Sequence, residues 1–291
     1  MTTAVIGATG RVGSLVVRQL LAQERQVVAI VRDAAKAREL FGAAGGGLRI
    51  RQAALDSLAE VRAALDGADT VFLAMGSVGL EGNLQRAAIQ AAATMPSIEQ
   101  LVRLSVFNAS PASLGINQRA HWNIDFAAQV AGIPYTTVRP AIWSASLLAA
   151  ATEVRRSRTW TGLADSGRVA LTDHRDPADL AVRVLTDPGL WGAHYDITGP
   201  RLFSWPEALE VLSEELGQKV TFVTASERDL IAKLTGQGVP AGQAELLIAR
   251  EWALLAGENE RLTTTFADVT GRPPRTVEDF LHENREIFTT R

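Results

Sequence analysis

Three glycines near the start of the chain are spaced in a way that suits the binding of a dinucleotide. Gly7, Gly10 and Gly13 form a G-x-x-G-x-x-G pattern between an apolar run and an amphipathic segment. The first permits a tight strand-to-helix turn, the second lets the backbone approach a pyrophosphate, and the third lets the helix pack closely on the strand. Free N–H groups and the helix dipole then favour the phosphates. The alternative is a loop that needs glycine only for its backbone angles.

A second group of candidate residues follows the next apolar run. NAD-specific domains place an acidic residue near this point to bind the ribose 2′-hydroxyl. Here Val31 is followed by Arg32, and Lys36 comes one helical turn later. Because a guanidinium binds phosphate in bidentate fashion, this pattern favours a 2′-phosphate and hence NADP over NAD. Asp33 is the rival ribose-binding residue, and a solvated surface arginine is the alternative without a function.

Alternating apolar strands and amphipathic helices would hold these residues in place. Strands are predicted at 3–6, 27–31, 48–53, 70–74, 100–105 and 135–139. Helices are predicted at 12–23, 34–41, 58–65, 84–93 and 121–131, and a glycine run at 45–47 breaks the chain before the third strand. This alternation predicts an α/β fold with a Rossmann-type, doubly wound parallel sheet and right-handed crossovers.

After residue 143 the pattern changes and predicts a smaller C-terminal α+β lobe. Helices are expected at 176–186, 205–216, 226–234, 240–256 and 276–288, and strands at 193–198 and 219–223. Asp176 precedes Pro177 and is expected to cap its helix. We expect residues 1–143 plus 176–198 to form the dinucleotide-binding domain, and residues 144–175 plus 199–291 to form the substrate-binding lobe.

The composition restricts the classes of function. The 291 residues carry a net charge of −3 and no cysteine, which excludes disulfides and thiolate catalysis and fits a reducing cytoplasm. The chain has no basic block of the kind that indicates a nucleic-acid partner. No apolar run reaches the roughly 18 residues of a membrane span. The first strand begins almost at Met1, so no signal peptide is expected. The four histidines lack metal-ligand spacing, so no metal is predicted. A monomer or homodimer that takes a small-molecule substrate is expected.

The sequence resembles the NmrA-like branch of the atypical short-chain dehydrogenase/reductase superfamily, which includes NAD(P)H:quinone oxidoreductases and azoreductase-like proteins. The resemblance covers nearly the whole chain, and the blocks at 135–140 and 195–200 discriminate best because they recur together in this branch. It rests on residues 7–13, 31–33, 66–73, 132–140, 195–200 and 270–280. The resemblance implies a Rossmann domain, a small second lobe and a substrate cleft between them.

The same resemblance implies further cofactor-binding residues at the carboxyl ends of strands, where open α/β sheets bind ligands. For the pyrophosphate and the adenosine half these are Thr9, Arg11, Val12, Ala74, Met75 and Gly76. For the nicotinamide they are Ser105, Val106, Phe107, Pro140, Ala141 and Ile142. Plain core packing is the alternative for Met75 and Phe107.

The resemblance also raises a question about catalysis, because relatives in the wider superfamily use a Tyr-x-x-x-Lys pair as proton donor. Counting back from Tyr135 puts Asn117 at the tyrosine position and His121 at the lysine position, and the pair occurs nowhere in this chain. His121 is a candidate to bind the nicotinamide ribose or to polarise a carbonyl, since imidazole titrates near working pH. Asn117 is a candidate to orient a carbonyl oxygen through its amide. The alternative for His121 is a hydrogen-bonded helix histidine without a chemical role.

Three functions are consistent with these residues. The first is an NAD(P)H-dependent oxidoreductase that reduces a quinone or a similar conjugated carbonyl, because the phenolate-like product needs no strong acid. The second is a non-catalytic NADP-sensing regulator of the NmrA type, which the missing Tyr-x-x-x-Lys pair favours. The third is a pathway-specific reductase or isomerase that acts on a biosynthetic intermediate.

Overall fold

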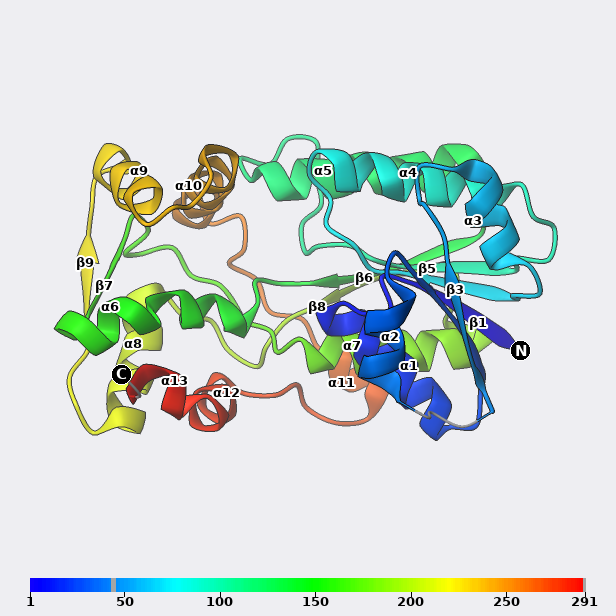
Figure 1. The fold of residues 1–291 in the computed structure, drawn as a ribbon. Coiled ribbons are helices and arrows are strands. Elements are labelled where there is room, and N and C mark those ends of the chain that lie inside the picture. Colours follow the sequence, from blue (N-terminus) through cyan, green and yellow to red (C-terminus); the bar gives the residue numbers. More distant parts are fainter. Residues whose placement is uncertain (43–45, 290–291) are drawn as a thin grey trace.

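The computed structural model describes residues 1–42 and 46–289, and its larger part is built on a seven-stranded sheet (Figure 1). The strand order is β3-β2-β1-β4-β5-β6-β8, and every pairing is parallel. The strands are β1 (Thr2–Ile6), β2 (Gln26–Val31), β3 (Leu48–Gln52), β4 (Thr70–Leu73), β5 (Gln100–Leu104), β6 (Tyr135–Pro140) and β8 (His194–Ile197). The predicted Rossmann-type sheet is confirmed. Gly45 of the predicted glycine break lies outside the described residues.

Helices cover both faces of this sheet (Figure 1). On one face lie α3 (Leu58–Leu65), α4 (Leu80–Ala93) and α5 (Ile116–Ala131). On the other lie α1 (Arg11–Ala22), α2 (Ala34–Phe41), α7 (Arg175–Thr186) and α11 (Thr265–Thr270). Because both faces are covered, the central strands are apolar along their length, as in the fully buried run from Val27 to Ile30. The strand order reverses between β1 and β4, which is the place where such sheets bind ligands.

Two helices begin a full turn or more earlier than the apolar pattern predicts. Helix α4 starts at Leu80 and not at residue 84, and α5 starts at Ile116 and not at residue 121. The first turns of both helices carry mainly polar or small side chains, so the helical period of apolar residues is absent there. The earlier start of α5 places Asn117 on the same helix as His121, one turn before it.

The second lobe contains a small parallel sheet, of which the sequence predicts one strand, at 219–223, but not the other. Strand β7 (Thr159–Gly162) pairs with β9 (Thr221–Thr224), which lies in a different part of the chain. The surrounding helices are η1 (Ser144–Ala150), α6 (Ala151–Ser157), α8 (Trp205–Leu216), α9 (Glu227–Gly236), α10 (Ala241–Leu255), α12 (Val277–Glu283) and α13 (Arg285–Thr289). The segment 276–288, predicted as a single helix, forms the two helices α12 and α13. A short helix η2 (Pro188–Leu190) precedes β8. We propose the domain division given above for these two lobes.

Asp176 does not cap its helix as expected. Helix α7 begins one residue earlier, at Arg175, so Asp176 lies within the first turn. Its buried carboxylate accepts hydrogen bonds from the backbone N–H of Arg275, at 3.0 Å, and from the Arg275 guanidinium. This aspartate therefore fixes the C-terminal segment onto α7.

None of the helices in the described residues is long and apolar enough to cross a membrane.

Candidate cofactor and substrate site

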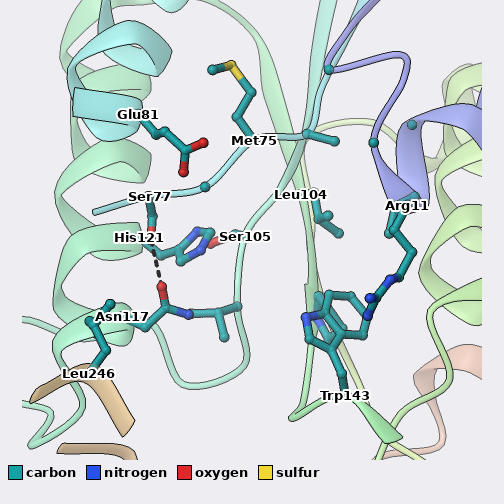
Figure 2. Close-up of a pocket in the computed structure, with 18 of the residues that line it drawn as sticks. Arg11, Met75, Ser77, Glu81, Leu104, Ser105, Asn117, His121, Trp143 and Leu246 are labelled. Carbon is teal, nitrogen blue, oxygen red and sulfur yellow. Dashed lines mark hydrogen bonds between the residues drawn. The ribbon is translucent and has the colours of Figure 1, made fainter. Parts of the chain in front are cut away.

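A cavity of about 750 Å³ opens at the carboxyl ends of the sheet strands (Figure 2). Its walls come from the loops after β1, β2, β4, β5 and β6, from α5, and from α10 of the second lobe. The cavity thus lies at the strand-order reversal and between the two lobes. This is the position that the sequence predicts for a cofactor beside its substrate.

The glycine loop after β1 presents backbone to this cavity. Gly7 adopts a positive φ of 82°, and a Cβ added to it would overlap the carbonyl oxygen of Ala74. A Cβ on Gly13 would overlap the carbonyl oxygen of Gly7, so both positions require glycine for the fold itself. Gly10 is the N-cap residue of α1 and supplies no side-chain cap, and the first turn holds no acidic residue. The uncapped N–H groups of α1 therefore fit a pyrophosphate.

The structure brings most of the predicted site residues together around this one cavity. Predicted residues that line it are Gly7, Thr9, Gly10, Arg11, Val12, Gly13, Arg32, Ala74, Met75, Gly76, Ser105, Val106, Asn117, His121, Pro140, Ala141 and Ile142. Two predicted residues do not line it. Phe107 is fully buried in the core of the second lobe, where Arg261 lies over its ring. Lys36 lies on α2 outside the cavity lining.

The residues after β2 divide into one that faces the cavity and one that supports a helix. The Asp33 carboxylate accepts a hydrogen bond from the backbone N–H of Lys36 at 3.0 Å and thereby caps α2. Arg32 lines the cavity and is exposed. Asp33 therefore caps α2 and is not among the residues that line the cavity, whereas Arg32 is.

Asn117 and His121 lie one turn apart on the face of α5 that borders the cavity (Figure 2). The hydroxyl of Ser77 donates a hydrogen bond to Oδ1 of Asn117 at 2.7 Å. Because this bond occupies the amide oxygen, the orientation of the side chain is fixed and its Nδ2 is the group that offers N–H donors. Asn117 therefore adds a neutral hydrogen-bond donor to the cavity wall.

His121 is held as a neutral imidazole. Its Nδ1 lies 2.8 Å from Nη2 of Arg103. Arginine can only donate, so Nδ1 is the acceptor and the ring proton sits on Nε2. Burial, together with the charges of Arg103 and Arg139, holds the pKa of His121 well below its usual value. The expectation that this imidazole titrates near working pH is therefore corrected: His121 can donate a hydrogen bond, as Asn117 can, but it is not charged at neutral pH.

Arg103 is the centre of a buried polar network that the sequence analysis missed. This fully buried side chain of β5 donates to Oε1 of Gln85 at 3.0 Å and forms an ion pair with Asp125. Asp125 also accepts from Ser105 at 2.8 Å and from Arg139 at 3.1 Å. The network joins β5 to α4 and α5. An arginine within an otherwise apolar strand is the signal that could have indicated it.

Gln85 extends this network to the loop that follows β4. Its Nε2 donates to the carbonyl oxygen of Gly76 at 2.6 Å, while its Oε1 accepts from Arg103. The wall that carries Gly76 and the helix that carries His121 are therefore connected through a single buried guanidinium. These bonds hold the loop after β4 and helix α5 in fixed positions relative to each other.

A pH titration of stability tests the neutral state of His121. Because its folded-state pKa lies below the unfolded value of about 6.5, acidification below that pH protonates the unfolded chain first. We expect His121 to lower the free energy of unfolding by up to about 1.4 kcal/mol per pH unit in this range. His121→Gln, which keeps an acceptor for Arg103, removes that contribution. Urea unfolding of both proteins between pH 5 and 8 measures the difference, and parallel curves would contradict the assignment.

Several residues around the cavity were not predicted from the sequence. Ser77 and Glu81 follow β4, and Trp143 and Ser146 follow β6. Leu246, Leu247 and Arg250 come from α10. The last three lie more than a hundred residues beyond α5 in the chain, so only the packing of α10 against α5 brings them to the site.

The parallel sheet, the glycine loop and the cavity at the strand-order reversal define a Rossmann-type dinucleotide-binding protein. The profile of the NmrA-like family matches residues 1–281, and the chain belongs to that family. It is 34% identical to an NAD(P)H azoreductase of Xenophilus azovorans, over 98% of both chains. It is 29% identical to quinone oxidoreductase 2 of Escherichia coli, over 94% of this chain and 95% of the other.

A solved structure gives the same picture of the fold. The crystal structure of an NADPH-dependent quinone oxidoreductase from Escherichia coli in complex with NADPH matches this chain with a TM-score of 0.90. The match has 28% sequence identity and covers 97% of this chain and 99% of the other. The likeness therefore includes the second lobe as well as the parallel sheet.

Proposed function

We propose that the protein is an NAD(P)H-dependent oxidoreductase that reduces a quinone or a similar conjugated carbonyl compound in the cavity between its lobes. The observation that carries this proposal is the pair of neutral donors, Asn117 and His121, on one face of α5. The similarity to an NAD(P)H azoreductase and to a quinone oxidoreductase of Escherichia coli, in sequence and in structure, supports it. The cytoplasm remains the proposed location, and a monomer or homodimer the proposed state.

The proposed mechanism assigns a distinct task to each part of the cavity wall. When bound, a reduced nicotinamide supplies a hydride, that is, one proton together with two electrons. The α1 N-terminus holds the pyrophosphate, and Asn117 Nδ2 and His121 Nε2 stabilise the negative charge that develops on the acceptor oxygen. The resulting hydroquinone monoanion takes its second proton from solvent. Neither donor residue needs to act as an acid, because a phenolate-like anion is already stabilised.

Replacing Asn117 tests this function directly. We expect Asn117→Leu to lower kcat for quinone reduction by about 100-fold, which is typical for the loss of one donor to a developing oxyanion. The dissociation constant for NADPH should change much less, because the pyrophosphate and ribose contacts are intact. NADPH oxidation followed by absorbance with a panel of quinones measures kcat, and calorimetry measures NADPH binding.

Asn123 offers a matched control for that experiment. It lies on the same helix but is exposed and does not line the cavity, so Asn123→Leu should keep kcat. Equal rates for the Asn117 and Asn123 variants would remove Asn117 from the mechanism. Tight NADPH binding by the wild-type protein with no oxidation by any quinone would instead favour the NADP-sensing regulator.

NADPH is the proposed form of the cofactor. Arg32 lines the cavity while Asp33 is engaged in capping α2, which supports binding of a 2′-phosphate more than of a free ribose hydroxyl. We expect Arg32→Gln to weaken NADPH binding by about 10- to 100-fold and NADH binding much less. Calorimetric titrations with both cofactors give the ratio. Equal losses for NADPH and NADH would overturn the preference for NADP.

A further inference from the structure

Two charged side chains of the cavity wall are not accounted for by the cofactor phosphates, and Arg250 is the cationic one. The charged residues that line the cavity are Arg11, Arg32, Arg250 and Glu81. Arg11 starts α1 beside the glycine loop, and Arg32 follows β2, so both belong to the proposed phosphate contacts. Arg250 comes from α10 in the other lobe. Arg250 therefore lines a part of the cavity wall that the phosphates of a dinucleotide do not explain.

The guanidinium of Arg250 is fixed by a buried carboxylate. Glu251, only 3% exposed, accepts from Nε and Nη2 of Arg250 at 3.2 and 2.8 Å through its Oε1. Its Oε2 accepts from the backbone N–H of Ala164 and from Nε1 of Trp205, both at 3.1 Å. Because each oxygen of Glu251 already has its own donors, Arg250 is held in one orientation before any ligand arrives.

The remaining nitrogen of Arg250 is available to a ligand. Nη1 makes no hydrogen bond to residues 1–42 or 46–289, and the side chain is 25% exposed. Arg250 lies one turn after Leu246 on α10, so both share a helix face. Figure 2 shows Leu246 beside Asn117. A partly buried guanidinium with an unpaired N–H thus borders the cavity on the side of α10, the helix that packs against α5.

We propose that Arg250 forms an anion subsite for the hydride acceptor. The inference rests on the proposed function and narrows its substrate class to planar conjugated carbonyl compounds that carry a carboxylate, sulfonate or phosphate group. Leu246 and Leu247 contact the apolar ring system, and Arg250 Nη1 donates a charge-assisted hydrogen bond to the anionic substituent. The bond needs no rearrangement of Arg250, because Glu251 already orients the guanidinium.

Steady-state kinetics with a matched pair of acceptors tests the subsite. The pair is naphthoquinone and naphthoquinone sulfonate, and the measured quantity is the ratio of their KM values. We expect Arg250→Met to reduce the preference for the sulfonate by about tenfold or more, as loss of one charge-assisted hydrogen bond implies. The control Arg228→Met removes a 95% exposed guanidinium outside the cavity and should keep the wild-type ratio. An unchanged ratio in the Arg250 variant would overturn the inference.

A binding measurement separates this inference from the proposed function. Calorimetry of the protein loaded with NADP⁺ compares naphthalene sulfonate with neutral naphthol and requires no turnover. Tighter binding of the sulfonate that disappears on replacement of Arg250 supports the subsite, even if no quinone is reduced. Equal binding of both compounds contradicts the subsite, even if neutral quinones are reduced.

A second variant guards against misfolding. Arg250→Met alone leaves the Glu251 carboxylate buried without its cation, which destabilises a fold. The double variant Arg250→Met with Glu251→Gln removes both charges and retains an oxygen for Trp205 and Ala164. We expect the same loss of sulfonate preference in this variant. Sulfonate binding that survives in the folded double variant would assign the anion to another group and overturn the proposal.

Discussion

Replacing Gly10 with alanine is expected to weaken NADPH binding by about 100-fold or more with little effect on folding. A Cβ at this position would meet only the carbonyl oxygen of Gly7, at 3.1 Å, a tight contact that a small shift of this oxygen relieves. The methyl group would instead enter the space in front of the α1 N-terminus, where the pyrophosphate is proposed to lie. Calorimetry with NADPH gives the dissociation constant, and thermal unfolding without cofactor reports the fold.

Two other glycines serve as references for this result. Gly46→Ala adds a Cβ in open space and should leave both NADPH binding and unfolding unchanged. Gly7→Ala places a Cβ against the Ala74 carbonyl at a positive φ, so it should lower the unfolding temperature as well as the affinity. Wild-type affinity in folded Gly10→Ala would show that the loop does not hold the phosphates.

Replacing Arg103 with methionine is expected to lower the free energy of unfolding by about 3–5 kcal/mol. The change leaves the Asp125 carboxylate buried without its closest cation, and Gln85 and His121 each lose a donor. Arg139 remains near Asp125 but belongs to β6 and does not reach the other two groups. Urea unfolding monitored by circular dichroism measures the loss.

Arg183 provides the comparison for that variant. It forms an ion pair with Asp187 one turn away on the surface, where the Arg183 side chain is 54% exposed. Arg183→Met should therefore cost less than about 1 kcal/mol. If the Arg103 and Arg183 variants unfold at the same urea concentration, the buried network does not stabilise the fold as proposed.

The parallel sheet could be predicted from the sequence because strand and helix periods alternate clearly through residue 140. The glycine spacing likewise predicts the backbone geometry at Gly7 and Gly13, since each glycine has a steric reason to be there. Asn117 and His121 were found only through a resemblance, by their distance from Tyr135. Nothing in their local sequence distinguishes them from other polar residues of a helix.

What could not be predicted depends on contacts between distant segments. Arg103 becomes the centre of a network only when α4 and α5 pack on β5, and its charge alone would have suggested an exposed residue. Arg250 reaches the cavity because α10 packs against α5, which no local pattern encodes. The pairing of β7 with β9 joins segments about sixty residues apart, and the short β7, unlike the strand predicted at 219–223, gives only a weak periodic signal.

The part of the cavity wall that α10 supplies has a consequence for how the substrate range of such a protein changes in evolution. His121 and the loop after β4 belong to the sheet domain and are linked through Arg103 and Gln85, so substitutions there disturb several partners at once. The wall that faces the acceptor includes Leu246, Leu247 and Arg250 of α10, whose main contact with the sheet domain is with α5. New acceptors can therefore be recruited by sequence drift in that helix, while the reductive machinery is inherited intact.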